Sequence, residues 1–246
     1  MAQQNSSPVK PYSASGSKKE QVGKMFDNIA PTYDFLNRFL SLGIDTIWRK
    51  KMVAHLNATD HRQVLDVATG TADVALEINK QIRPEHIKGV DISNEMLAVG
   101  RKKIAKRQLS ETIDLQYGDS ENLPFEDQTF DAVTVAFGVR NYENLDQGLR
   151  EMQRVLKPGG KIVVLEFSRP RAFPLKQGFN FYFKNILPFI GKLQSKDARA
   201  YDYLYESVQS FPDGDAFLER LQRAGFSATQ EERLTIGIAS LYIGVK

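Results

Sequence analysis

The chain has 246 residues, 41% of them hydrophobic and 26% charged, and 33 Lys and Arg against 30 Asp and Glu give a formal net charge of +3. This length and composition are typical of one α/β domain with an additional lobe. Charges so evenly balanced argue against nucleic acid as the main partner. The absence of cysteine excludes disulfides, thiolate zinc sites and cysteine nucleophiles.

No segment resembles a targeting signal or a membrane span. Residues 1–22 contain neither an apolar run nor arginine, so we expect a disordered tail rather than a secretory or transit peptide. The most apolar segment, 179–193, is interrupted by Lys184, Pro188 and Lys192 and falls short of the ~20 apolar residues that cross a bilayer. We therefore expect a cytoplasmic protein with a single domain over residues 23–246.

The first ordered segment, residues 23–60, has the pattern of helices. Phe35 and Phe39, like Leu36 and Leu40, are four residues apart and predict an amphipathic helix. Asp45 is placed as the N-cap of a second helix.

From residue 64 the sequence alternates between short apolar runs and helical segments. Strands are predicted over 64–68, 87–92, 113–118, 130–137 and 161–168, and helices over 72–82, 94–108 and 145–156. Ser93 is the expected N-cap of the second of these helices, and a KPGG turn (157–160) leads into the fifth strand. This alternation predicts a parallel sheet with helices on both faces, whose ligands bind beyond the carboxyl ends of the strands.

The alternation stops at residue 170. Residues 170–212 are aromatic and helical in period, and we interpret them as an insertion that forms a lid. A helix over 215–224 and two closing strands follow, which predicts a C-terminal antiparallel hairpin. The expected fold is a seven-stranded, largely parallel Rossmann-like sheet with this hairpin and a helical lid.

The turn in "VLDVATGTADVA" (64–75) is the first candidate binding site. It holds one glycine, Gly70, where a dinucleotide-binding loop has three. Asp66, Asp91 and Asp119 each lie at or near the end of a successive strand, and Asp91 is 21 positions after Gly70, a spacing suited to a carboxylate that binds a ribose diol. A ribose carboxylate suits both NAD and S-adenosylmethionine.

The small residues of this loop discriminate between the two nucleotides. A pyrophosphate needs glycine at the crowded turn positions, whereas this chain has Ala68 and Ala72. S-adenosylmethionine has no phosphates, and Thr71 offers a hydroxyl and an N–H at a helix N-terminus. The loop therefore favours S-adenosylmethionine.

Several longer stretches resemble class I S-adenosylmethionine-dependent methyltransferases, and more narrowly the ubiquinone/menaquinone biosynthesis C-methyltransferases. They are "YDFLNRFLSLG" followed by Trp48, "VLDVATGTADVA", "GVDISNEMLAVGRKK", "GDSENLPFEDQTFDAVTVAFGVRN" and "RVLKPGGKIVVLEFSRP". The resemblance runs from about Lys24 to the C-terminus. One departure is Asp45, where the family usually has histidine.

The resemblance implies which residues contact the methyl donor. Thr71 and Gly70 would lie at its methionine end, Asp91 would bind the ribose hydroxyls, and Asp119 would accept from the adenine amino group with Ser120 beside it. Asp66 would either orient the loop or hold the methionine ammonium. No metal site is expected.

The resemblance also implies a prenylated quinol as the methyl acceptor. Tyr33, Asp34, Arg140 and Asn141 are the catalytic candidates: Arg140 could stabilise a phenolate and Asn141 could hydrogen-bond the ring oxygen. Either Asp34 or a water would take the proton. Alternatively, Arg140 forms a structural ion pair, with Glu166 as its candidate partner, and Tyr33 and Asp34 only anchor the N-terminal helices.

The aromatic residues of the lid leave two interpretations open. They could hold a prenyl tail and contact the inner face of the plasma membrane, which predicts that polar replacements of Phe181 and Phe183 weaken long-tailed quinols most. Alternatively, they are the core of the lid.

The reaction that this resemblance most directly implies is methylation of demethylmenaquinol, the last step of menaquinone synthesis. Three alternatives stay open: the benzoquinol methylation of ubiquinone synthesis, a non-catalytic protein with this fold, and an NAD-dependent oxidoreductase. The oligomeric state is open as well, with a homodimer as one possibility.

Overall fold

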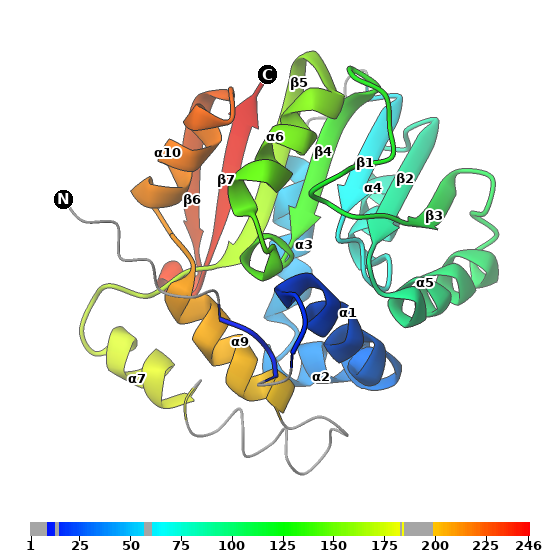
Figure 1. The fold of residues 1–246 in the computed structure, drawn as a ribbon. Helices are drawn as coiled ribbons and strands as arrows, with labels where there is room; N and C mark the ends of the chain where they lie inside the picture. The colour runs from blue at the N-terminus through cyan, green and yellow to red at the C-terminus, as the bar shows by residue number, and fades with distance from the viewer. Residues whose placement is uncertain (1–8, 13–14, 57–60, 183, 185–198) are drawn as a thin grey trace.

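The computed structural model describes residues 9–12, 15–56, 61–182, 184 and 199–246, which form one twisted sheet surrounded by helices (Figure 1). The seven strands lie in the order β3-β2-β1-β4-β5-β7-β6. The strands are β1 (Gln63–Val67), β2 (His86–Asp91), β3 (Ile113–Tyr117), β4 (Phe130–Ala136), β5 (Leu156–Phe167), β6 (Ser227–Leu234) and β7 (Ala239–Val245). The first five pair in parallel, and β7 pairs antiparallel with both β5 and β6. The expected fold class and its C-terminal hairpin are confirmed.

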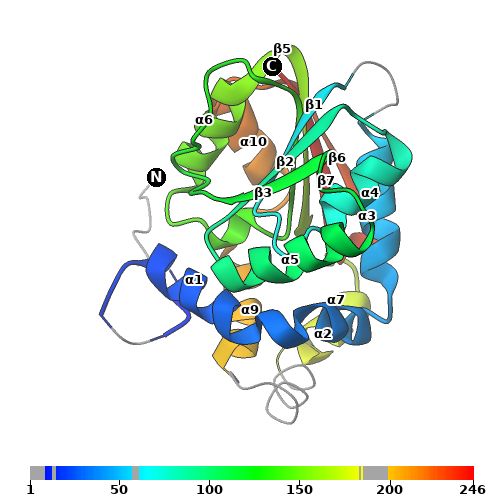
Figure 2. The ribbon, with the colours of Figure 1, turned by 90° about the vertical axis from the view of Figure 1, so that its right-hand side faces the viewer.

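Helices cover both faces of the sheet, as Figure 2 shows edge-on. The α-helices are α1 (Lys18–Ile29), α2 (Tyr33–Leu40), α3 (Ile44–Ala54), α4 (Asp73–Gln81), α5 (Asn94–Lys106), α6 (Leu145–Val155), α7 (Leu175–Phe181), α9 (Arg199–Ser210) and α10 (Asp215–Arg223). Because side chains alternate along a strand, Val64 packs with α3, α4 and α5, while Leu65 packs with α6 and α10 on the opposite face. This two-sided burial explains the continuous apolar runs of the strands.

A third group of helices, α1, α2, α7 and α9, lies beyond the carboxyl ends of the parallel strands (Figure 1). These helices share a separate hydrophobic cluster that includes Val22, Leu36, Phe179 and Tyr203. The N-terminal helices and the residues 170–182 and 199–212 of the expected lid therefore meet over the edge of the sheet where ligands bind in this class of fold. Among the described residues, no helix is both long enough and apolar enough to cross a bilayer.

The N-terminal boundary expected at residue 22 is wrong, because α1 begins at Lys18. The side chain of Ser17 accepts from the backbone of Glu20, and the Glu20 side chain accepts in return from the backbone of Ser17. This capping box satisfies two backbone donors and fixes the start of the helix. Residues 1–8 and 13–14 of the expected tail lie outside the described residues.

The role expected for Asp45 is also wrong. The N-cap of α3 is Gly43, whose φ of 78° is a left-handed conformation that glycine adopts without strain. Asp45 lies one residue inside the helix, where its carboxylate accepts from the Ser41 hydroxyl at 2.7 Å and pairs with Arg49. Its oxygens are therefore used by side chains rather than by the helix backbone.

Three further local features refine the expected elements. The helical segment before α3 is divided by a 3₁₀ turn, η1 (Ala30–Thr32), which contains Pro31. The KPGG stretch lies within β5, where the pairing register with β4 shifts between Phe130 and Ala132. The expected N-cap Ser93 is confirmed, since its side chain accepts from the backbone N–H of Met96 at 3.2 Å.

Candidate functional site

The loop between β1 and α4 has an unusual backbone for its residues. Ala68, Gly70 and Ala72 have φ values of 52°, 54° and 66°. The two alanines thus occupy left-handed conformations that glycine would adopt more easily. The loop has the backbone shape of a glycine-rich turn, with methyl groups at two of its positions.

Asp66, on β1, hydrogen-bonds to this loop. It is 1% exposed, and its carboxylate accepts from the hydroxyls of Thr69 at 2.6 Å and Thr134 at 2.8 Å. Burial raises the pKa of Asp66 to about 6. Of the two roles expected for Asp66, these contacts support orientation of the loop.

A narrow cavity, with a volume of about 60 Å³, lies beyond the ends of β1, β2 and β4. We call it the sheet-edge cavity. Four of the expected donor-binding residues line it, namely Gly70, Asp91, Asp119 and Ser120. Asp91 accepts from the backbone N–H groups of Gly70 at 2.8 Å and Ser93 at 2.9 Å, which fixes its carboxylate at the end of β2. Burial raises the pKa of Asp91 to about 6.

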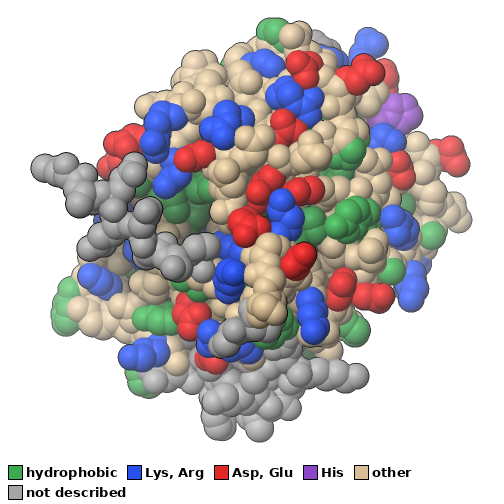
Figure 3. All heavy atoms as spheres, in the orientation of Figure 1, with side chains coloured by type: hydrophobic (Ala, Val, Ile, Leu, Met, Phe, Trp, Pro, Cys, Tyr) green, Lys and Arg blue, Asp and Glu red, His purple; other side chains and the backbone are tan. Residues whose placement is uncertain are grey.

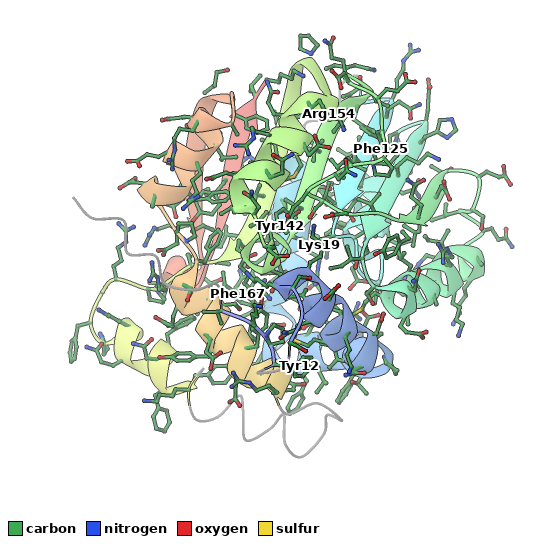
Figure 4. All side chains as sticks on the ribbon, in the orientation of Figure 1. Tyr12, Lys19, Phe125, Tyr142, Arg154 and Phe167 are labelled. Atoms are coloured by element: carbon green, nitrogen blue, oxygen red, sulfur yellow. The ribbon has the colours of Figure 1, made fainter. Side chains whose placement is uncertain are left out.

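Helix α1 closes one side of the sheet-edge cavity. Lys19 donates to the carboxylate of Asp119 at 2.6 Å, and Lys18 donates to the backbone oxygens of Arg140 at 3.0 Å and Tyr142 at 2.9 Å. Figure 4 shows Lys19 and Tyr142 at this contact between α1 and the segment after β4. Burial lowers the pKa of Lys18 to about 8. The contacts of α1 were not predicted, since this part of the sequence was expected to be a tail.

Thr71 and Asp34 are brought together by hydrogen bonds at the start of α2. The Thr71 hydroxyl donates to Asp34 at 2.6 Å, and Lys103 donates to the other oxygen of Asp34 at 2.9 Å. Lys103 also pairs with Asp73 in the first turn of α4. Neither Thr71 nor Asp34 is among the described residues that line the sheet-edge cavity or its neighbour.

The neighbouring cavity is larger, with a volume of about 660 Å³, and its lining is largely apolar. We call it the apolar cavity, and α2, α3, α7 and α9 supply much of its wall. Four side chains line both cavities: Phe26, Tyr33, Phe137 and Asn141. The two cavities therefore adjoin at these four side chains.

The turn after β4 brings the two polar candidates Arg140 and Asn141 to this junction. The guanidinium of Arg140 pairs with the fully buried Glu166 at 2.8 Å, so the ion pair expected as an alternative is present. Asn141 donates to the backbone oxygen of Phe137 at 3.2 Å. The Nε of Arg140 and the Oδ1 of Asn141 are buried and have no hydrogen-bond partner among the described residues. Unpaired buried polar atoms are costly unless a ligand satisfies them.

An aromatic cluster forms the floor of the apolar cavity. The rings of Phe137 and Phe167 lie 4.7 Å apart, and Trp48 contacts both. Arg140 lies over Phe167 at 5.4 Å and Arg49 over Phe137 at 5.8 Å. Figure 4 labels Phe167 at the end of β5, facing the helices. This cluster can stack against a planar ring between two cations.

Arg49 and Asp45 both line the apolar cavity, although Arg49 is not among the residues predicted from the sequence and Asp45 was expected to be an N-cap. The available signal for Asp45 was its departure from the histidine that the family usually has at this position. The histidines lie elsewhere: His55 contacts Glu232 at 2.7 Å, and His61 contacts the backbone oxygen of Leu56.

Comparison with known sequences gives consistent matches over nearly the whole chain. The sequence model of the ubiE/COQ5 methyltransferase family matches residues 14–246. A demethylmenaquinone methyltransferase from Bacteroides fragilis is 50% identical over 238 residues, which is 97% of each chain. A ubiquinone/menaquinone biosynthesis C-methyltransferase from Geotalea daltonii is 48% identical over 93% of this chain and 97% of its own.

Comparison with solved structures supports the fold. An S-adenosylmethionine-dependent methyltransferase from Thermotoga maritima has a TM-score of 0.62 at 20% identity, covering 91% of this chain and 99% of that one. Another from Methanococcus maripaludis has a TM-score of 0.61 at 20% identity and covers 96% of each chain. At this identity the likeness concerns the arrangement of strands and helices.

Proposed function

The chain belongs to the ubiE/COQ5 methyltransferase family, and from this premise we infer that it methylates a ring carbon of a prenylated quinol with S-adenosylmethionine. The acceptor that we propose is demethylmenaquinol, which makes the reaction a step of menaquinone biosynthesis. The observation that carries the proposal is the junction of the sheet-edge cavity and the apolar cavity at four shared side chains.

The residues of the sheet-edge cavity fit the methyl donor. Asp91 offers a fixed carboxylate for the ribose hydroxyls, and Asp119 already accepts from an amino group, that of Lys19, as it would from adenine. The methyl groups of Ala68 and Ala72 occupy positions where a pyrophosphate would require glycine. We propose that Thr71 acts indirectly, by holding α2 through Asp34.

S-adenosylmethionine supplies a methyl group on a sulfonium, which a nucleophilic carbon displaces in line. Catalysis of such a displacement depends chiefly on position and on the exclusion of water. Tyr33, Phe137 and Asn141 would align the two reactants, because they line both cavities. Arg140 and the unpaired oxygen of Asn141 would contact the ring oxygen of the acceptor.

The acceptor must be the quinol, because an oxidised quinone ring is too electron-poor to attack a methyl group. The test is methylation of one short-tailed demethylnaphthoquinone with and without a chemical reductant, monitored by mass spectrometry. We expect product only in the reduced sample. Equal rates in both samples would refute the requirement for a quinol.

The choice between menaquinone and ubiquinone synthesis needs a cellular measurement, because the relative from Geotalea daltonii is named for both pathways. We expect cells that lack the protein to accumulate a naphthoquinone that is one methyl group lighter than menaquinone. Accumulation of a benzoquinone instead would assign the other pathway.

S-adenosylmethionine, and not NAD, should raise the melting temperature of the purified protein.

The apolar cavity suits the prenyl tail. Phe179 of the expected lid lines it, whereas Phe181 is 62% exposed and is not among the described lining residues; Phe183 lies outside the described part of the chain. We therefore expect Phe179→Ser to weaken long-tailed quinols much more than tail-less ones. Phe181→Ser is the matched control, and equal losses for both quinols in Phe179→Ser would favour a purely structural role.

We propose further that the mouth of the apolar cavity contacts the cytoplasmic surface of a membrane, from which the tail enters. Phe39, Leu42 and Ile236 line the cavity and are 48%, 86% and 71% exposed. Exposed apolar groups at one opening are typical of an interaction site. Binding to vesicles of zwitterionic and anionic phospholipid should fall in Leu42→Ser, but not in Tyr117→Ser, a 59% exposed control on β3.

A further inference from the structure

The apolar cavity contains one carboxylate among the described residues that line it, and this is Asp45. The Asp45 residue is 4% exposed, and the same cavity is lined by the cations Arg49 and Arg140. We propose that Asp45 accepts the hydroxyl proton of the quinol as its ring is methylated. The inference rests on the proposed function and assigns the proton acceptor that the function requires.

The neighbours of Asp45 fix the position of its carboxylate but leave some of its hydrogen-bond acceptor positions free. It accepts from the Ser41 hydroxyl at 2.7 Å and pairs with Arg49, and a carboxylate has about four acceptor positions. The other titratable groups nearby are Tyr33 on α2, which lines the same cavity, and Asp73 on α4, which lies 4.0 Å from Arg49. Arg49 thus compensates a negative charge that would otherwise be costly beside apolar walls.

Asp34, the carboxylate first considered for this role, is already used. Its oxygens accept from Thr71 at 2.6 Å and from Lys103 at 2.9 Å. These bonds hold α2 against α5 and against the loop that precedes α4. Asp34 is also absent from the described lining of the apolar cavity, so a quinol bound there would not reach it.

The proton and electron balance follows from the chemistry of the acceptor. The quinol O–H bond breaks and its proton moves to Asp45; the electron pair forms a C=O bond, and a ring electron pair forms the new carbon–carbon bond. The bond from methyl carbon to sulfur breaks, and its electron pair stays on sulfur. The methylated dienone then loses its ring proton to water, which restores the aromatic ring, and its oxygen takes the proton back from Asp45. One proton is released to solvent overall.

A carboxylate paired with arginine is a weak base, but this transfer does not require a strong one. As the ring carbon bonds to the methyl group, positive charge reaches the hydroxyl and makes its proton strongly acidic. A positioned base that acts in such a transition state contributes roughly 10²–10⁴-fold to the rate. Asp45 therefore needs position more than basicity.

The test compares Asp45→Asn, Asp45→His and Asp73→Asn with a reduced short-tailed demethylnaphthoquinol and S-adenosylmethionine. We expect Asp45→Asn to lower kcat about 100-fold or more, with unchanged affinity for S-adenosylmethionine. Asp73→Asn removes another carboxylate beside Arg49 but outside the apolar cavity, so its kcat should stay within about threefold of the wild type. Asp45→His should recover most of kcat and lose it at low pH, as imidazole titrates near its ordinary pKa of about 6.5.

Two measurements, the kcat of Asp45→Asn and the pH profile of Asp45→His, can contradict the inference. A kcat for Asp45→Asn within about threefold of the wild type would overturn it, as would an Asp45→His variant that is equally slow at every pH. If Asp45→Asn fails to fold, the pH profile of Asp45→His decides alone. A wild-type protein that methylates no quinol would refute the proposed function instead, which the same assay reveals first.

Discussion

Asp66 gives the most quantitative prediction. Its pKa is raised by burial from 3.8 to about 6, a shift of roughly two pKa units at about 1.4 kcal/mol each, or about 3 kcal/mol. The sign follows from proton binding: between these two pKa values the native state holds a proton that the unfolded chain has released. The contribution to stability is therefore present below pH 3.8 and is lost as the pH rises through about 6.

The variant Asp66→Asn removes this dependence, because its amide is neutral at every pH and has nearly the same shape. The measured quantity is the free energy of unfolding of the variant minus that of the wild type. We expect this difference to be about 1.5 kcal/mol more positive at pH 8 than at pH 5. Urea unfolding followed by circular dichroism at the two pH values measures this difference. The hydroxyls of Thr69 and Thr134 can rotate to pair with the amide, so the fold should be retained.

Asp131 provides the matched control. Its bonds to Lys157 and to two backbone N–H groups lower its pKa, although burial opposes them. Its contribution to stability is therefore present above pH 3.8 and is lost only as the pH falls through its folded pKa. Asp131→Asn should be destabilising by the same amount at pH 5 and pH 8. If Asp66→Asn also changes the free energy of unfolding by the same amount at pH 5 and pH 8, the raised pKa of Asp66 does not contribute to stability as argued.

Three further predictions concern charges and a helix cap around the site. Glu166→Gln leaves the buried guanidinium of Arg140 without its counter-ion and should cost about 3 kcal/mol in the free energy of unfolding, measured with urea; a loss below about 1 kcal/mol would contradict the burial of this pair. Ser93→Ala removes an N-cap and should cost about 1–2 kcal/mol by the same method, with an unchanged stability arguing against the cap. Lys19→Met frees Asp119 and should tighten binding of S-adenosylmethionine up to about fivefold in calorimetry, whereas weaker binding would mean that Lys19 itself contacts the ligand.

Much of the sheet could be predicted because its signals are local and regular. The inner strands β1, β2 and β4 are short apolar runs buried on both faces, so their positions follow from the sequence without knowledge of their partners. Gly70, Asp91, Asp119 and Ser120 could be placed at one cavity because the carboxyl ends of these strands meet at one edge. Figure 3 shows acidic and basic side chains mixed over one face, in keeping with their near-equal numbers.

The contacts of the N-terminal helices could not be predicted in the same way. From the sequence alone, Lys18 and Lys19 were assigned to a polar, disordered tail. Their partners lie 100 or more residues away along the chain, so no local pattern reveals them. Asp34 and Asp45 are both acids in the first turn of a helix, α2 and α3 respectively, and only packing decides that one turns toward Lys103 and the other toward the apolar cavity. Which acid faces the cavity is thus a property of the tertiary structure.

The division of the site into two cavities has a consequence for how this protein could change its specificity. The walls of the sheet-edge cavity come largely from loops at the ends of the strands, whereas those of the apolar cavity come largely from α2, α3, α7 and α9. Only Phe26, Tyr33, Phe137 and Asn141 belong to both. If the sheet-edge cavity binds the methyl donor as proposed, exchanging the helices for those of a relative, while keeping these four residues, would redirect the enzyme to acceptors of another shape without rebuilding the donor half.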